Sequence, residues 1–260
     1  MKARGKKPTR RNSLEDKPKP ILEHFRELRI RLIVSILSLI ITATIAWWFS
    51  DYVIMWLTGP VSSLGVPPLT LHFTTITEAF GTRFMIAIIG GLVLSTPVLI
   101  FEICMFILPG LLSKERKVLF AYLPLLILLF LVGSGFAAYP IVPWTRQFFL
   151  GFQAPNLMPI ITISSYIDFS LMLILGMGLI FLLPVVILMV TSLRLVSPFT
   201  IGKWRKFVWV IILIAAAAIA PDDGISMLIV AIPVVFLFEI SLFVARAKWR
   251  KQSIKKGLTI

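Results

Sequence analysis

"FVWVIILIAAAAIAPDDGISMLIVAIPVVFLFEISLFVA", residues 207–245, consists of two apolar runs separated only by the residues PDDG. A connection this short forces the two runs to lie antiparallel, as a helical hairpin. As a helix, the first run at 207–220 would reach only about 21 Å, whereas the hydrocarbon core of a bilayer is about 30 Å thick. We therefore predict that the chain ends in a membrane hairpin made of short fifth and sixth spans.

Four longer apolar runs precede this hairpin, and each is long enough to cross a bilayer: 30–49, 85–108, 118–139 and 168–192. The composition agrees with this interpretation, since 58% of the residues are hydrophobic, 15% are charged and the mean hydropathy is +0.95. A soluble domain has about a quarter of its residues charged. The predicted fold is an all-α integral membrane protein with six transmembrane helices.

The distribution of Lys and Arg residues indicates which side each terminus faces. Under the six-span count, 24 of the 26 cationic residues lie on one side of the membrane, and only Arg83 and Arg146 lie on the other. Lys and Arg collect on the cytoplasmic side of membrane proteins. We therefore predict that both termini are cytoplasmic and that segments 50–84 and 140–167 are long external loops.

Prolines inside the expected spans predict an irregular bundle. A proline removes one backbone hydrogen bond and bends the helix that contains it. Because kinked helices pack into concave shapes, we expect a kinked, concave bundle; the prolines concerned are Pro97, Pro124, Pro184 and Pro233.

The regions outside the spans predict the domain organisation and exclude several functions. Residues 1–20 are basic and lack an apolar core, so we expect a disordered cytoplasmic tail rather than a cleavable signal, followed by a membrane domain at 21–247 and a second basic tail at 248–260. The net charge of +14 indicates topology and contact with anionic lipids rather than nucleic acid. With one cysteine, Cys104, and no GxSxG or HExxH motif, the sequence predicts no metal, no cofactor and no enzyme activity.

Three acidic residues lie within or at the edge of the spans: Glu102, Glu239 and Asp168. An ionisable residue in a membrane is a candidate functional group. The two glutamates also lie close enough to the cytoplasmic ends to pair with basic loops, so function and pairing both remain open. In "ILEHFRELRIRL", residues 21–32, Glu27 precedes Arg31 by four residues, the favourable orientation for a helical ion pair.

Four stretches, in order along the chain, resemble the TatC family of the twin-arginine protein translocase. They are "EHFRELRIRL" at 23–32, "FILPGLLSKER" at 106–116, "PDDGIS" at 221–226 and "AIPVVFLFEISLFVAR" at 231–246. The resemblance covers residues 21–247. It implies a receptor that binds the twin-arginine signal peptides of folded precursors, recruits single-span partner subunits of the TatA or TatB type, and works as an oligomeric complex in the cytoplasmic membrane.

The resemblance also implies residue roles. Matching positions predict signal-peptide binding by Glu27, Arg29, Phe106, Pro109 and Glu115, and structural or partner contacts by Pro60, Asp223 and Glu239. The chemistry agrees, because a carboxylate accepts a guanidinium in a bidentate geometry that a lysine ammonium cannot reproduce.

The sequence departs from the family pattern at two positions, and other functions remain open. Leu182 stands where many relatives carry Glu or Gln, and Met227 stands where Gln is common. A polar intramembrane site would therefore need Asp168 or backbone groups freed by Pro184. The alternatives are a small ion- or proton-coupled secondary transporter and an assembly factor for membrane proteins.

Overall fold

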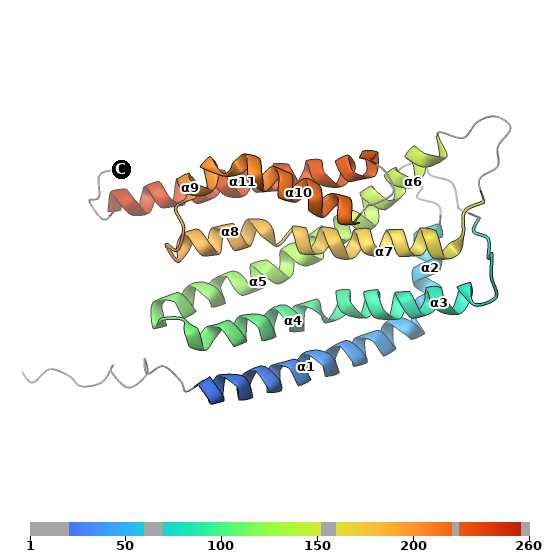
Figure 1. The fold of residues 1–260 in the computed structure, drawn as a ribbon, viewed down its shortest axis with the longest axis horizontal. Coiled ribbons are helices and arrows are strands. Elements are labelled where there is room, and N and C mark those ends of the chain that lie inside the picture. Colours follow the sequence, from blue (N-terminus) through green and yellow to red (C-terminus); the bar gives the residue numbers. More distant parts are fainter. Residues whose placement is uncertain (1–20, 60–69, 152–159, 220–223, 256–260) are drawn as a thin grey trace, which may run out of the picture.

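The computed structural model describes residues 21–59, 70–151, 160–219 and 224–255, which are helical over most of their length (Figure 1). Pro60, Asp223 and both terminal tails beyond these ranges lie outside the described residues. The elements are α1 (Ile21–Trp48), α2 (Ser50–Thr58), α3 (Glu78–Met85), η2 (Ile86–Gly90), α4 (Gly91–Ile107), η3 (Leu108–Gly110), α5 (Ser113–Phe136), η4 (Ala137–Ile141), α6 (Val142–Leu150), α7 (Ile163–Ile180), α8 (Leu183–Ser192), α9 (Pro198–Lys203), α10 (Arg205–Ile219) and α11 (Gly224–Lys255).

Five helical stretches are long and apolar enough to cross a membrane: His24–Trp48, Glu78–Gly110, Glu115–Leu150, Ile163–Ser192 and Met227–Arg250. They confirm the predicted all-α, multi-span fold. The predicted fifth span corresponds to α10, which has only 15 residues. The sixth span was predicted to be short as well, but α11 is 32 residues long. A count of six therefore depends on α10 and stays a prediction.

Both segments that we expected to be external loops contain helices: α2 and most of α3 lie within 50–84, and residues 140–150 of the second segment are helical. The helix of α5 continues through the π-helical turn η4, which contains Pro140, into α6, which has Pro143 in its first turn. A wider π turn accommodates the missing N–H of a proline inside a helix, and a proline in the first turn needs no partner. The prediction of a loop was thus wrong for residues 140–150.

The helices run side by side, with their ends gathered at two ends of the bundle (Figure 1). At one end α1 begins, α4 ends, α5 begins, and α8 and α11 end; we call it the basic end. α1 packs against α4 and η2, α5 packs against α7 and α8, and α11 packs against α8 and α10. At Gly91 the α1 backbone lies so close that an added Cβ would lie 2.6 Å from the Ala43 Cα. The small residues thus permit close packing of α1 on α4.

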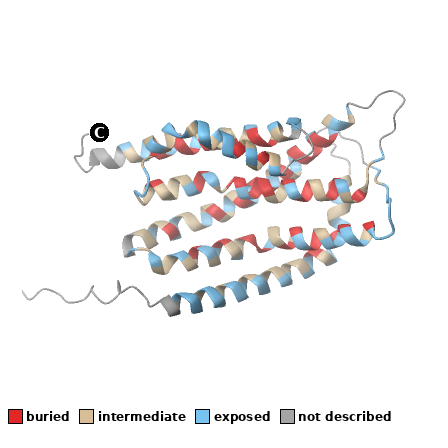
Figure 2. Cartoon of the chain, viewed as in Figure 1, coloured by how far each residue is buried: buried red, intermediate tan, exposed pale blue. Residues whose placement is uncertain are grey.

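The burial pattern is that of a membrane protein (Figure 2). The buried core lies mainly among α5, α7, α10 and α11 and includes Phe130, Ile167, Met177, Ala216 and Phe238. By contrast, only 6% of the apolar window of α1 is buried, although its mean hydropathy is 2.1. Apolar side chains that point outward around a helix require a lipid environment.

Candidate functional site

Two contacts join the start of α1 to the end of α4 at the basic end. Arg31 Nη1 donates to Glu102 Oε2 over 3.1 Å, and both side chains are more than three-quarters buried. About two turns of α1 earlier, the His24 ring stacks on the Phe106 ring with 4.5 Å between centroids. The helix that carries Glu27 and Arg29 is therefore held against the helix that carries Phe106.

The turn between α4 and α5 presents the next two candidate residues. Pro109 lies in the 3₁₀ turn η3, which ends α4. Leu112 then adopts an extended conformation and begins α5, where Glu115 Oε2 accepts the Leu112 N–H over 2.9 Å. This hydrogen bond satisfies a donor that the first helical turn leaves unpaired, and the negative charge is favourable at a helix N-terminus. Glu115 is thus fixed in place by its own helix.

The structure gathers these candidate residues at the basic end. Glu27 and Glu115 are half-buried, whereas Arg29 is exposed. Phe106, near the end of α4, and Pro109, in the turn between α4 and α5, are also half-buried (Figure 1). The helices that carry these two carboxylates both begin at this end, and each carboxylate is of the type that accepts a guanidinium group. The sequence spacing did not predict the Arg31–Glu102 pair, because its partners are far apart in the chain.

The other residues that the sequence singled out have these surroundings where they are described. Glu239 of α11 accepts from Arg205 Nη2 of α10 over 2.7 Å, so both intramembrane glutamates are in ion pairs. Leu182 lies at the kink between α7 and α8 and packs partly buried against a core cluster, and Met227 packs against another. Asp168 of α7 has one buried oxygen, Oδ1, for which the described residues provide no hydrogen-bond partner.

At the opposite end, Glu78 links two helix starts, a contact that the sequence did not lead us to expect. Glu78 is the first residue of α3, and its Oε2 accepts from the Thr74 N–H at 2.7 Å and the Thr74 hydroxyl at 2.8 Å, in the segment that leads into α3. Its Oε1 accepts from the Ser164 N–H at 3.1 Å and the Ser164 hydroxyl at 2.7 Å, in the first turn of α7. The signal was present in "TITE", residues 75–78, which has the spacing of a capping box.

The two cations that the charge pattern left on the opposite side both hold α2. Arg83 Nη2 donates to Asp51 Oδ1 over 2.7 Å. Arg146, only 5% exposed, donates over 3.3 Å to the carbonyl oxygens of Leu57, Thr58 and Gly59 at the end of α2. A guanidinium is a favourable partner for helix C-terminal carbonyls, since it has several donors and complements the helix dipole. Both arginines therefore have structural partners.

An apolar cavity of about 430 Å³ lies between α1, α2, the η2–α4 helix and α7. Its lining is entirely apolar and includes Phe49, Ile86, Leu94 and Leu171. The described residues contain no cluster of His, Cys, Asp and Glu that could hold a metal ion.

Long apolar helices, ion pairs at helix ends and outward-facing apolar side chains define this chain as a multi-pass integral membrane protein. The family model described as Sec-independent protein translocase protein (TatC) matches residues 23–233. The chain belongs to the TatC family, which confirms the resemblance seen in its sequence. Because the family consists of protein translocases, membership also confirms the expectation that the chain is not an enzyme.

Individual relatives match over nearly their full lengths. The chain is 37% identical over 234 residues to the Sec-independent protein translocase protein TatC of Carboxydothermus hydrogenoformans, covering 90% of this chain and 95% of that protein. It is 34% identical over 232 residues to the TatCy protein of Bacillus subtilis, covering 89% and 90%. A crystal structure of the twin arginine translocase receptor TatC matches with a TM-score of 0.75 at 32% identity, covering 85% of this chain and 99% of the solved one.

Proposed function

We propose that this chain is the receptor subunit of a twin-arginine translocase and binds twin-arginine signal peptides at its basic end. The observation that supports this proposal most directly is the position of Glu27 and Glu115 on helices at the basic end. The His24–Phe106 stack holds the start of α1, and the Leu112 hydrogen bond holds Glu115 at the start of α5. The match to the solved receptor over most of the chain supports the same assignment. The alternatives, a coupled transporter and an assembly factor, have no comparable support.

The two carboxylates would accept the two guanidinium groups of the signal. Glu115 uses one oxygen for its own helix, which leaves the other for a ligand. Arg29 and the neighbouring cations would repel basic peptides that lack a well-placed pair of arginines. We infer that Phe106 and Pro109 form the adjoining apolar floor.

The apolar part of the signal would lie along α4. Three of its side chains, Leu94, Val98 and Phe101, are exposed and follow one another at helical spacing on one face of α4. An extended or helical apolar segment would bury this stripe, and its arginines would then reach the basic end.

The proposed setting is the cytoplasmic membrane, with both termini and the basic end in the cytoplasm. The excess of Lys and Arg at this end supports that orientation. The α10–α11 pair would form the last two of six spans, with Lys206 at the membrane surface. Single-span subunits of the TatA or TatB type would complete the complex.

Photocrosslinking tests the binding proposal. A photoreactive amino acid at Leu112, which is 62% exposed and directly precedes the Glu115 turn, is expected to crosslink to a twin-arginine precursor. The matched control is the same amino acid at Tyr52, which is 70% exposed at the opposite end of the bundle. Equal crosslinking at both positions, or loss of signal dependence at Leu112, would overturn the proposal.

Cysteine labelling tests the orientation. In a Cys104→Ala background, single cysteines at Ile76 and Ile160, which are 100% and 74% exposed, are expected to react with an impermeant maleimide added outside. Cysteines at Leu112 and Thr200, both exposed, are expected to stay unlabelled until the membrane is opened. Outside labelling at Leu112 would contradict the proposed topology.

A further inference from the structure

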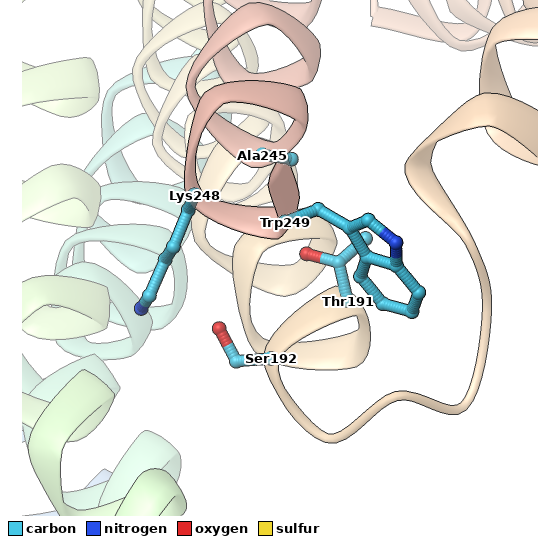
Figure 3. Close-up of a pocket in the computed structure, with 5 residues that line it drawn as sticks. All are labelled: Thr191, Ser192, Ala245, Lys248 and Trp249. Atoms are coloured by element: carbon cyan, nitrogen blue, oxygen red, sulfur yellow. The ribbon is translucent and has the colours of Figure 1, made fainter. Parts of the chain in front are cut away.

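A small polar cluster at the basic end joins α5, α8 and α11 and is separate from the proposed signal site. Lys248 Nζ of α11 donates to the Tyr122 hydroxyl of α5 over 2.7 Å. The Tyr122 and Ser192 hydroxyls share a hydrogen bond of 2.9 Å, and Ser192 is the last residue of α8. Lys248 also lies over the Tyr122 ring, 5.1 Å from its centroid. Figure 3 shows Lys248, Ser192 and Trp249 around a small pocket between α8 and α11.

This cluster has more hydrogen-bond donors than acceptors. The ammonium carries three N–H groups, and each hydroxyl carries one O–H, which makes five hydrogens. The two hydrogen bonds of the cluster use two of them. Within the described residues, the remaining three have no further acceptor. Whichever hydroxyl donates in the Tyr122–Ser192 bond, the other keeps its hydrogen, so a ligand with several acceptor oxygens would complete the cluster.

The cluster also carries positive charge that no described carboxylate neutralises. The Arg194 guanidinium adds a second cation near the pocket, 5.6 Å from the centre of the Trp249 ring, which lines the pocket with Lys248. The membrane-end glutamates are engaged elsewhere, Glu102 with Arg31 and Glu239 with Arg205. An anion is therefore the ligand that this charge favours.

We propose that this cluster binds the phosphodiester group of an anionic phospholipid. A phosphodiester has only acceptor oxygens, and the pocket, about 10 Å³, admits about one oxygen atom. The ring of Trp249 is amphipathic and typical of the membrane–water boundary. Leu195, 65% exposed just beyond Arg194, offers apolar contact to an acyl chain. The assignment to the cytoplasmic leaflet rests on the proposed topology.

Native mass spectrometry of the full chain in detergent measures this binding directly. We expect dioleoylphosphatidylglycerol to bind at least five-fold more tightly than dioleoylphosphatidylcholine. Lys248→Gln should weaken the first phosphatidylglycerol affinity by about five-fold, the effect of one cation near anionic lipid. Arg250→Gln is the matched control, because it removes the same charge from an exposed position on the same helix, and it should change the affinity less than two-fold.

Three further measurements distinguish a lipid ligand from a free phosphate ester, and ligand binding from a purely structural role of the cluster. Glycerol phosphate, which has the headgroup chemistry without acyl chains, should bind far more weakly than the lipid; equal binding would overturn the lipid assignment. Lys248→Arg should restore the affinity. Tyr122→Phe should retain at least half of it, because Lys248 keeps its charge, whereas a cluster that only braces the helices would lose as much with Tyr122→Phe as with Lys248→Gln.

Equal losses with Lys248→Gln and Arg250→Gln would also overturn the proposal, since the effect would then be one of total charge. Melting temperatures in the same detergent show whether a variant remains folded, and Lys248→Arg supplies the readout if Lys248→Gln does not. No signal peptide is present in these measurements. Failure of twin-arginine binding would therefore leave their outcome unchanged.

Discussion

Replacing Glu115 tests signal recognition most directly, because its carboxylate has two roles that substitutions can separate. One oxygen accepts the Leu112 N–H over 2.9 Å and caps α5. In the proposed function, the other oxygen accepts a guanidinium of the signal. Glutamine keeps a carbonyl oxygen for the cap but carries no charge, whereas alanine removes both.

The two substitutions therefore predict different results. Glu115→Ala should weaken binding of a twin-arginine signal peptide by about 10- to 150-fold, which corresponds to the roughly 1.5–3 kcal/mol of a hydrogen bond to a charged group. Glu115→Gln retains a neutral hydrogen bond and should weaken binding by about five-fold. Because alanine removes the cap as well as the charge, Glu115→Ala should lower the free energy of unfolding by about 1 kcal/mol, and by more than Glu115→Gln, which loses only the favourable charge at the helix N-terminus.

The assay is titration of the detergent-solubilised chain with a fluorescent signal peptide, in parallel with thermal melts at the same ionic strength. A twin-lysine peptide is the matched ligand, because an ammonium lacks the planar fork of a guanidinium. Both substitutions should affect twin-lysine binding less than twin-arginine binding. The reasoning is refuted if Glu115→Gln binds the twin-arginine peptide as tightly as the unmodified chain, or if both peptides lose affinity by the same factor.

Other side chains give further expected outcomes. Arg31→Gln leaves Glu102 mostly buried without its ion-pair partner, so the free energy of unfolding should fall by about 1–3 kcal/mol; the double variant with Glu102→Gln should recover part of this loss, and no recovery would argue against the pair. Arg146→Gln should lower the melting temperature in detergent, since three carbonyls of α2 lose a charged donor, and an unchanged melting temperature would contradict that role. Leu182→Ala should leave signal affinity within a few-fold, as expected of a packing residue, whereas a loss as large as that of Glu115→Ala would show a functional position.

Hydropathy predicted the long helices well because a span must satisfy its backbone internally and present apolar side chains to lipid. It was less successful where local chemistry competes. Residues 140–150 were expected to be a loop between spans, but a π turn that contains Pro140 and the first turn of α6, which contains Pro143, accommodate both prolines in a helix. The charge pattern placed Arg83 and Arg146 on the minority side, and the structure explains both exceptions, since each holds α2.

The candidate site shows a similar division. The capping hydrogen bond of Glu115 is local, because its two partners lie only three residues apart in the chain. The Arg31–Glu102 pair and the Lys248–Tyr122 bond join residues 71 and 126 positions apart, so only the packing of whole helices brings them together. A single sequence carries no signal for such pairs.

Glu78 has a mechanical consequence for the bundle. Because Glu78 begins α3 and its carboxylate is bonded to Ser164 in the first turn of α7, the second and fourth spans are pinned to each other at that end. The backbone pairing of His72 with Ile161 and Ile163 fastens the same two connections. Two rods pinned at one tip can separate only at the other. Any spreading of these spans would therefore pivot about Glu78 and be widest at the basic end, where the signal is proposed to bind.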